Sequence, residues 1–282
     1  MNRRFFSFSL AAILWCAVAL FLLMVDISPA TFAAESFPEL ADKVADVLPE
    51  PPDGFRWELV WHDEFDGNEV DRSRWDSPNY QRKGGWWSEK SFALDGEGNL
   101  KMMVFQDADG KFTDGCLRTR GTYEKAKGYF VARMKMHKQV GHWSAFWLMN
   151  GCEGSVGNGS ADGAEIDIME KPWLDDRVNF AIHWDGYGAE HRSCVHVARI
   201  PDVMDGFHTF SLWWSDDFYR FYIDGRQEWE TTADGICTEP LYLKLSDEIG
   251  TWAGDINQAT LPDETLIDYV RVYDLVPIQH EN

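Results

Sequence analysis

Short stretches in which apolar and polar residues alternate fill this sequence from residue 55 to residue 276, and they constrain the fold more than any other feature. A period of two is typical of strands, and Gly, Asp and Asn turn signals separate the stretches. The clearest examples are residues 57–61, 129–136, 179–184, 209–214, 219–223 and 265–273. We find no long amphipathic helix between them, which disfavours a parallel α/β fold. The pattern therefore predicts one all-β domain, built as a two-sheet antiparallel sandwich.

The first 33 residues have the layout of a secretory signal peptide. Arg3 and Arg4 precede an apolar run over residues 5–25, and small residues follow up to Ala33, where we expect cleavage. The run is also long enough to span a bilayer, so an uncleaved membrane anchor is the alternative. We expect a secreted, periplasmic or surface-attached protein that contacts a membrane only if this segment is retained.

The rest of the chain divides into a linker, one domain and a short tail. Acidic residues and prolines over residues 34–54 predict a linker, residues 55–276 form the domain, and residues 277–282 are the tail. Four cysteines lie outside the leader, namely Cys116, Cys152, Cys194 and Cys237. Export to an oxidising compartment permits disulfides, but four cysteines allow three pairings and their spacing selects none.

Acidic residues outnumber basic ones, which excludes some classes of partner. The sequence has 47 Asp and Glu against 26 Lys and Arg, a formal charge of -21. A surface this negative repels a phosphate backbone, so nucleic acid is not expected as a partner. The 14 tryptophans offer flat apolar faces on which neutral rings can stack, and a neutral, ring-bearing ligand fits this balance best. We expect the protein to act as a monomer.

Three acids within six positions form the most informative cluster, in the run Gly-Ala-Glu-Ile-Asp-Ile-Met-Glu-Lys-Pro. On a helix Glu165, Asp167 and Glu170 would point in widely different directions and could not converge on one substrate. On a strand, Glu165 and Asp167 share one face, and Glu170 is out of phase by one residue. A β-bulge around Ile168 and Met169 would return Glu170 to that face.

Paired carboxyls of this kind suit glycoside hydrolysis. A retaining glycosidase uses one ionised carboxylate to attack the anomeric carbon and one protonated carboxyl to protonate the leaving oxygen. A third acid between them can orient the nucleophile, because crowded carboxylates do not all ionise together. The alternative is a solvated edge strand, since an acidic chain produces such clusters by chance.

At these residues the sequence resembles glycoside hydrolase family 16, whose bulged signature is Glu-x-Asp-x-x-Glu. Further segments resemble the blocks of this family in the same order, and they cover residues 57–67, 127–136, 141–149, 180–188, 205–214, 221–225 and 267–274. The resemblance implies a concanavalin-A-like jelly roll with an open cleft on its concave sheet. It also implies an endo-acting enzyme that cuts internal β-linkages of a polysaccharide with retention of configuration.

The same resemblance assigns a role to each acid. Glu165 would be the nucleophile, Glu170 the general acid and then base, and Asp167 the acid that orients the nucleophile. The bulged spacing is typical of family members that act on laminarin-type β-1,3-glucans and on algal galactans.

Candidate substrate-binding residues are mostly tryptophans. Trp143 and Trp147 are four residues apart and share a strand face, which the resemblance makes the cleft face; either could instead be ordinary core. His183 is expected near the leaving-group side of the cleft. Trp87 and Trp252 lie in predicted loops, where they would either border the cleft or close a small apolar cluster.

No cofactor is required for this chemistry, and no cysteine and histidine spacing suggests zinc. Members of the family often hold a structural calcium ion on the convex side with an acid near each end of the domain. Glu64 and Asp268 stand in comparable places, so they are the candidate ligands. Hard cations need six or more oxygens, and the sequence does not show the others.

The choice of polymer follows from charge. A strongly negative domain should bind sulfated carrageenan poorly unless the cleft carries a basic patch. Arg82, Lys83, Arg118 and Arg120 are candidates for such a patch but show no clustering with the catalytic strand in the sequence. We therefore favour a β-1,3- or mixed β-1,3/1,4-glucan, with an agarase or carrageenase and a non-catalytic lectin as alternatives. The sequence does not separate hydrolysis from transglycosylation.

Overall fold

The computed structural model describes residues 48–151 and 154–279. The predicted leader, most of the predicted linker and Cys152 lie outside the described residues. Cys116 and Cys194 carry free thiols. Among the described residues, no helix is long and apolar enough to cross a membrane.

Two β-sheets make up the domain, as the alternation predicts. The larger sheet comprises β1 (Phe55–Asp63), β2 (Tyr80–Arg82), β3 (Gly85–Trp87), β4 (Phe92–Leu94), β5 (Leu100–Gln106), β6 (Phe112–Asp114), β9 (Gly128–Lys135), β14 (His208–Trp214), β15 (Tyr219–Ile223), β16 (Arg226–Thr231) and β18 (Asp263–Pro277). The smaller sheet comprises β7 (Cys116–Arg118), β8 (Glu124–Lys125), β10 (His142–Met149), β11 (Glu165–Lys171), β12 (Arg177–Trp184), β13 (Arg192–Arg199) and β17 (Leu241–Ile249). The short 3-10 helices among the described residues are η2 (Glu89–Ser91), η3 (Thr251–Ala253) and η4 (Ile256–Gln258).

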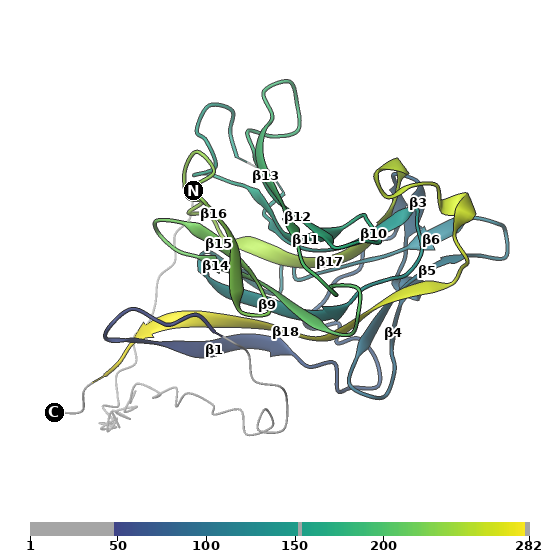
Figure 1. The fold of residues 1–282 in the computed structure, drawn as a ribbon, viewed down its shortest axis with the longest axis horizontal. Helices are drawn as coiled ribbons and strands as arrows, with labels where there is room; N and C mark the ends of the chain where they lie inside the picture. Colours follow the sequence, from purple (N-terminus) through teal and green to yellow (C-terminus); the bar gives the residue numbers. More distant parts are fainter. Residues whose placement is uncertain (1–47, 152–153, 280–282) are drawn as a thin grey trace, which may run out of the picture. The chain divides into compact units, whose positions relative to one another are not determined.

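The strand order places the predicted catalytic strand inside the smaller sheet. Its order is β13-β12-β11-β10-β17-β7, whereas the central path of the larger sheet runs β16-β15-β14-β9-β18-β5-β6-β3-β2. The described pairings are antiparallel except for β3 with β6. In Figure 1 the strands of the smaller sheet lie over β9 and β14 of the larger one. The predicted two-sheet antiparallel sandwich is confirmed.

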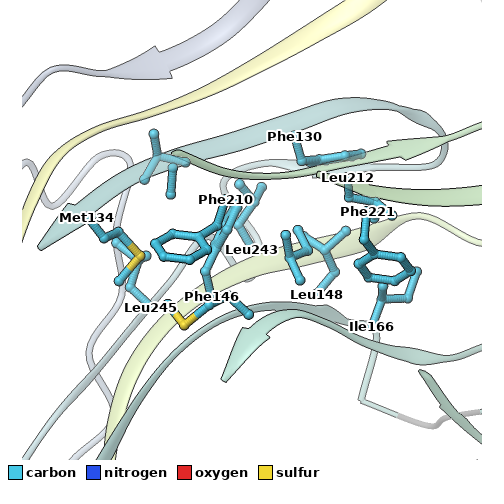
Figure 2. Packing of buried hydrophobic residues seen from close by; sticks show 14 of the residues in the cluster. Phe130, Met134, Phe146, Leu148, Ile166, Phe210, Leu212, Phe221, Leu243 and Leu245 are labelled. Carbon is cyan, nitrogen blue, oxygen red and sulfur yellow. The ribbon is translucent and has the colours of Figure 1, made fainter. Parts of the chain in front are cut away.

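The apolar core fills the space between the two sheets. Figure 2 shows side chains from the larger sheet meeting side chains from the smaller sheet, and those it labels are Phe130, Met134, Phe210, Leu212 and Phe221 on one side and Phe146, Leu148, Ile166, Leu243 and Leu245 on the other. Strand β10 shows how the sequence achieves this, because Phe146 and Leu148 face the core while Trp143 and Trp147 face away from it. Burial of each large apolar side chain contributes roughly 1.5–3 kcal/mol.

We expect Phe146→Ala to lower the free energy of unfolding by about 3–5 kcal/mol, because the phenyl ring leaves a cavity in a rigid core. Its side chain is fully buried. The measurement is urea unfolding followed by tryptophan fluorescence. Val156→Ala is the control, since Val156 is 62% exposed and should change stability by less than about 0.5 kcal/mol. Equal effects of the two variants would contradict this description of the core.

Candidate active site

A β-bulge in β11 arranges the three acids. On β10, Phe146 pairs with Met169 and Trp147 pairs with Asp167, so Ile168 has no partner there. Ile168 and Met169 are both fully buried in the core between the sheets. The extra residue therefore restores Glu170 to the face that already carries Glu165 and Asp167, as the sequence predicts.

Glu170 is set up as a proton donor. Asn179 on β12 donates a hydrogen bond from Nδ2 to Glu170 Oε2 over 2.9 Å, and Trp143 donates from Nε1 to Oε1 over 3.2 Å. Burial of the carboxyl, reinforced by the negative charge of Asp167, raises the pKa of Glu170 to about 8. The group therefore keeps its proton at neutral pH, as a general acid must.

Asp167 lies between the two glutamates along the strand. It is almost fully buried, and burial together with the charge of Glu165 raises its pKa well above the usual range. A protonated Asp167 can donate a hydrogen bond to an ionised neighbour, which suits an acid that orients the nucleophile. His183 contacts it, with Nε2 3.3 Å from Asp167 Oδ2.

The expected place of His183 near the leaving group is wrong. In the antiparallel register of β11 and β12, His183 pairs with Glu165, and Asn179 pairs with Glu170. His183 therefore lies at the nucleophile's end of the site. Asn179, which sequence reasoning missed, occupies the place beside the general acid. Its position four residues before His183, on the same strand face, is the signal that could have found it.

The two tryptophans of β10 lie on the predicted face, but lysines cover their rings. Trp143 and Trp147 are only 4% and 5% exposed. Lys83 Nζ lies 4.3 Å from the ring centroid of Trp143, and Lys244 Nζ lies 3.4 Å from that of Trp147. The expected open platforms are thus cation-capped aromatic surfaces, in which the ammonium groups face the cleft.

Trp87 and Trp252 have different surroundings. Trp87 is buried, with Arg82 and Lys244 over its ring at 4.7 and 5.1 Å, so it supports two cations and does not itself border the cleft. Trp252 is 42% exposed, and its ring meets that of Trp143 edge-on at a centroid distance of 5.4 Å. Of the two predicted loop candidates, Trp252 alone is available to a ligand.

A cavity of about 500 Å³ opens beside the nucleophile, and basic residues dominate it. Its lining consists of Tyr80, Arg82, Lys83, Arg118, Arg120, Trp147, Met149, Gly151, Glu165, Tyr187, Tyr242 and Lys244. The four basic residues that appear scattered in the sequence therefore do cluster with the catalytic strand. These residues lie on or next to β2 and β7, which are distant from β11 in the sequence. Only the folded chain brings them together.

Lys244 is a fifth cation that sequence reasoning missed. It is 5% exposed, and no carboxylate of the described residues forms an ion pair with its ammonium group, which donates to Met149 Sδ over 3.6 Å. Burial lowers its pKa. Glu248, by contrast, binds Arg82 and Lys83 at 2.8 and 2.7 Å and so fixes the turn between β2 and β3. Lys244 pairs with Trp147 on the adjacent strand β10, and this pairing gave no signal in the sequence.

The predicted calcium ligands are engaged by arginines. Arg271 donates to both carboxylate oxygens of Glu64 at 2.9 Å, and Arg133 pairs with Asp268. Each acid is therefore neutralised by a guanidinium, and the expected acidic ligand pair does not form.

Two other groups of side chains in the described ranges come close enough to share a metal ion. The first group is His137, His142 and Asp247, and the second is Glu165, Asp167 and His183. In the first group, His142 Nδ1 lies 2.7 Å from Asp247 Oδ1, and Ser144 donates to the other oxygen of Asp247 over 2.9 Å. These hydrogen bonds account for the buried group as a structural network. The second group contains two of the three predicted catalytic acids.

Comparison with known proteins accounts for this arrangement. The sequence profile described as "Beta-porphyranase A-D, GH16 domain" matches residues 57–275. The chain belongs to glycoside hydrolase family 16. It is 26% identical to glucan endo-1,3-beta-glucosidase A1 of Niallia circulans, with 76% of this chain and 37% of that protein covered. It is also 26% identical to beta-porphyranase E of Zobellia galactanivorans, with 80% and 91% covered.

A solved structure shows the same fold. The endo-beta-1,3-glucanase of Pyrococcus furiosus is 27% identical, with a TM-score of 0.64 over 82% of this chain and all of that one. The chain spans little more than a third of the Niallia relative. The residues matched by the family profile include Glu165, Asp167 and Glu170.

We expect the pH dependence of kcat/KM to have its basic limb near pH 8, because activity requires the protonated form of Glu170 and its pKa is about 8. As pH rises through that value the proton is lost and the rate falls. The measurement is the release of reducing ends from a polymer that the wild type cleaves, between pH 4 and 10. A basic limb near pH 5 would contradict the buried environment described for this carboxyl.

We expect Glu170→Gln to slow polymer cleavage by about 10²–10⁴-fold, since the amide cannot protonate the leaving oxygen. The rate of cleavage of an aryl glycoside whose leaving group is an acidic phenol should fall much less, because a phenolate leaves without being protonated. A matched loss on both substrates would argue against the general-acid role.

Proposed function

We propose that the chain is an endo-acting, retaining hydrolase of an anionic, sulfated β-galactan. The observation that carries the substrate is the basic cavity beside Glu165, above all the buried Lys244 ammonium. A sulfate ester stays ionised at all relevant pH values, and it would supply the counter-charge that the described residues do not place in an ion pair with Lys244. The predicted leader agrees with action on a polymer outside the cell.

The reaction proceeds in two displacements. Glu165 attacks the anomeric carbon through a carboxylate oxygen while Glu170 gives its proton to the leaving glycosidic oxygen, so the sugar bond breaks as the glycosyl ester forms. Glu170, now ionised, takes a proton from a water molecule that attacks the same carbon. The ester bond breaks, Glu165 regains its negative charge, and the configuration is retained. This pair of acids favours an enzyme over a lectin.

Local charge outweighs net charge in the choice of substrate. The formal charge of -21 led us to favour a neutral glucan. At physiological ionic strength, screening limits the range over which exposed charges interact to about 8 Å. The charges that act on a bound sugar are therefore mainly those of the cavity lining. Arg82, Lys83, Arg118, Arg120 and Lys244 all lie there. The profile match to a porphyranase domain and the porphyranase relative support the same substrate class.

A β-1,3-glucan is the second candidate. The glucanase relatives and the Pyrococcus structure support it. The deciding experiment is reducing-end release from porphyran, κ-carrageenan, agarose and laminarin, with Glu165→Gln as the blank. Cleavage of a sulfated galactan but not of laminarin supports the proposal. Cleavage of laminarin alone refutes it and leaves the mechanism in place.

We expect Lys244→Met to raise KM on the sulfated polymer by about 10–100-fold, the loss expected for a charged hydrogen bond. Methionine is also unbranched and is shorter by one heavy atom, and removing a buried charge should not unfold the domain. Lys101→Met on β5 of the larger sheet is the matched control and should leave KM unchanged. The wild-type KM should rise with salt more steeply than that of Lys244→Met, and equal salt dependence would contradict the role of the ammonium.

A further inference from the structure

The loop between β12 and β13 reaches back over the catalytic strand. Within it, Tyr187 donates a hydrogen bond from its hydroxyl to Glu165 Oε2, although its side chain is 58% exposed. His191 stands at the far end of the loop, with Nε2 3.0 Å from His183 Nδ1. Neither Tyr187 nor His191 is among the residues predicted from the sequence to form the site.

The hairpin geometry places this loop over the nucleophile. Because His183 pairs with Glu165 on one side and Ser193 on the other, β12 ends beside the nucleophile. The chain then reverses through Asp185 and Gly186, whose φ angles of 59° and 69° lie in the left-handed region. Asp185 accepts a hydrogen bond from the backbone nitrogen of Gly157 over 3.1 Å, which anchors the turn.

Ring contacts hold the tyrosine in this position. The rings of Tyr187 and His191 have centroids 5.9 Å apart, and the rings of His191 and His183 are stacked at 5.1 Å with an interplanar angle of 15°. His183 in turn contacts Asp167. A continuous chain of contacts thus runs from Tyr187 through two histidines to the acid beside the nucleophile.

We propose that Tyr187 is a catalytic residue whose hydroxyl stabilises the negative charge of the nucleophile. A hydrogen bond from a hydroxyl to a carboxylate oxygen favours the charged form of the carboxyl, and the Tyr187 hydroxyl makes this contact with Glu165 Oε2. The contact occupies Oε2 and leaves Oε1 to attack the sugar.

The same contact acts on the second displacement. In the glycosyl ester, Oε1 carries the sugar and Oε2 is the carbonyl oxygen. When water releases the sugar, negative charge returns to the carboxylate, and the hydroxyl of Tyr187 already points at Oε2 to receive it. The hydrogen bond therefore favours breakdown of the covalent intermediate.

A sugar platform is the competing role for an exposed tyrosine. Tyr187→Phe separates the two roles, because it keeps the ring and removes only the hydroxyl. An aromatic platform would survive this change with an unaltered pH profile, whereas a hydroxyl that stabilises Glu165 would not. The side chain is largely exposed, so the domain should fold normally.

Other charged groups face Glu165, and the substitution leaves all of them in place. On β11 and β12 and in the loop between β12 and β13 they are Asp167, Glu170, His183 and His191. On or next to β2, β7 and β17 they are Arg82, Lys83, Arg118, Arg120 and Lys244. A change in the acid limb of the pH profile between wild type and Tyr187→Phe therefore reports on the hydroxyl.

The test rests on the nucleophile assigned in the proposed function but not on the polymer. On whichever polymer the wild type cleaves, kcat/KM is measured from pH 4 to 10 for wild type, Tyr187→Phe and Tyr80→Phe. For Tyr187→Phe we expect a loss of about 10–100-fold, typical of a hydrogen bond to a charged group. We also expect its acid limb to move to higher pH while the basic limb stays. Tyr80 lines the same cavity. Tyr80→Phe should leave the acid and basic limbs of the pH profile at the wild-type pH, even if its KM changes.

A second measurement needs no substrate. The carboxyl carbon of Glu165 is followed by ¹³C NMR during a pH titration and assigned by its loss in Glu165→Gln. Its midpoint should move to higher pH in Tyr187→Phe and stay in Tyr80→Phe. Unmoved midpoints and unmoved acid limbs would overturn the proposal, even if the substrate preference proposed above is correct. Cleavage of a neutral glucan would overturn that preference and leave this inference standing.

Discussion

The extra residue in β11 is the constraint on which the rest of the site depends. Ile168 and Met169 both fill the core between the sheets, and only a bulge lets two consecutive side chains do so. With regular alternation, Glu170 would point into an apolar core, where a carboxylate costs several kcal/mol. Packing of the core therefore also places the general acid in the cleft.

The site gives its three carboxyls different surroundings, and their different tasks follow from that. Asp167 and Glu170 are buried, which favours the protonated form of each. Glu165 instead meets the hydroxyl of Tyr187 and borders the basic cavity. One strand thus carries a proton donor and a charged nucleophile a few residues apart, because neighbouring strands and loops supply unlike environments.

Charge is distributed unevenly in this protein, and the unevenness bears on substrate choice. The chain is strongly negative as a whole, yet five basic residues line the cavity beside the nucleophile. Glu248 holds two of them, Arg82 and Lys83, whereas Lys244 rests on the rings of Trp87 and Trp147. A cation supported by aromatic rings is still available to an anionic ligand.

The sequence by itself determined the β-sandwich, the bulge and the shared strand face of Glu165, Asp167 and Glu170, because alternation and the spacing of these acids are local properties of the chain. Only the tertiary structure decided what surrounds them. The register of β12 placed His183 beside Glu165 and Asn179 beside Glu170, a hairpin loop brought Tyr187 to Glu165, and arginines paired with the carboxylates of Glu64 and Asp268. These contacts join residues far apart in sequence, and no local pattern encodes which strands become neighbours.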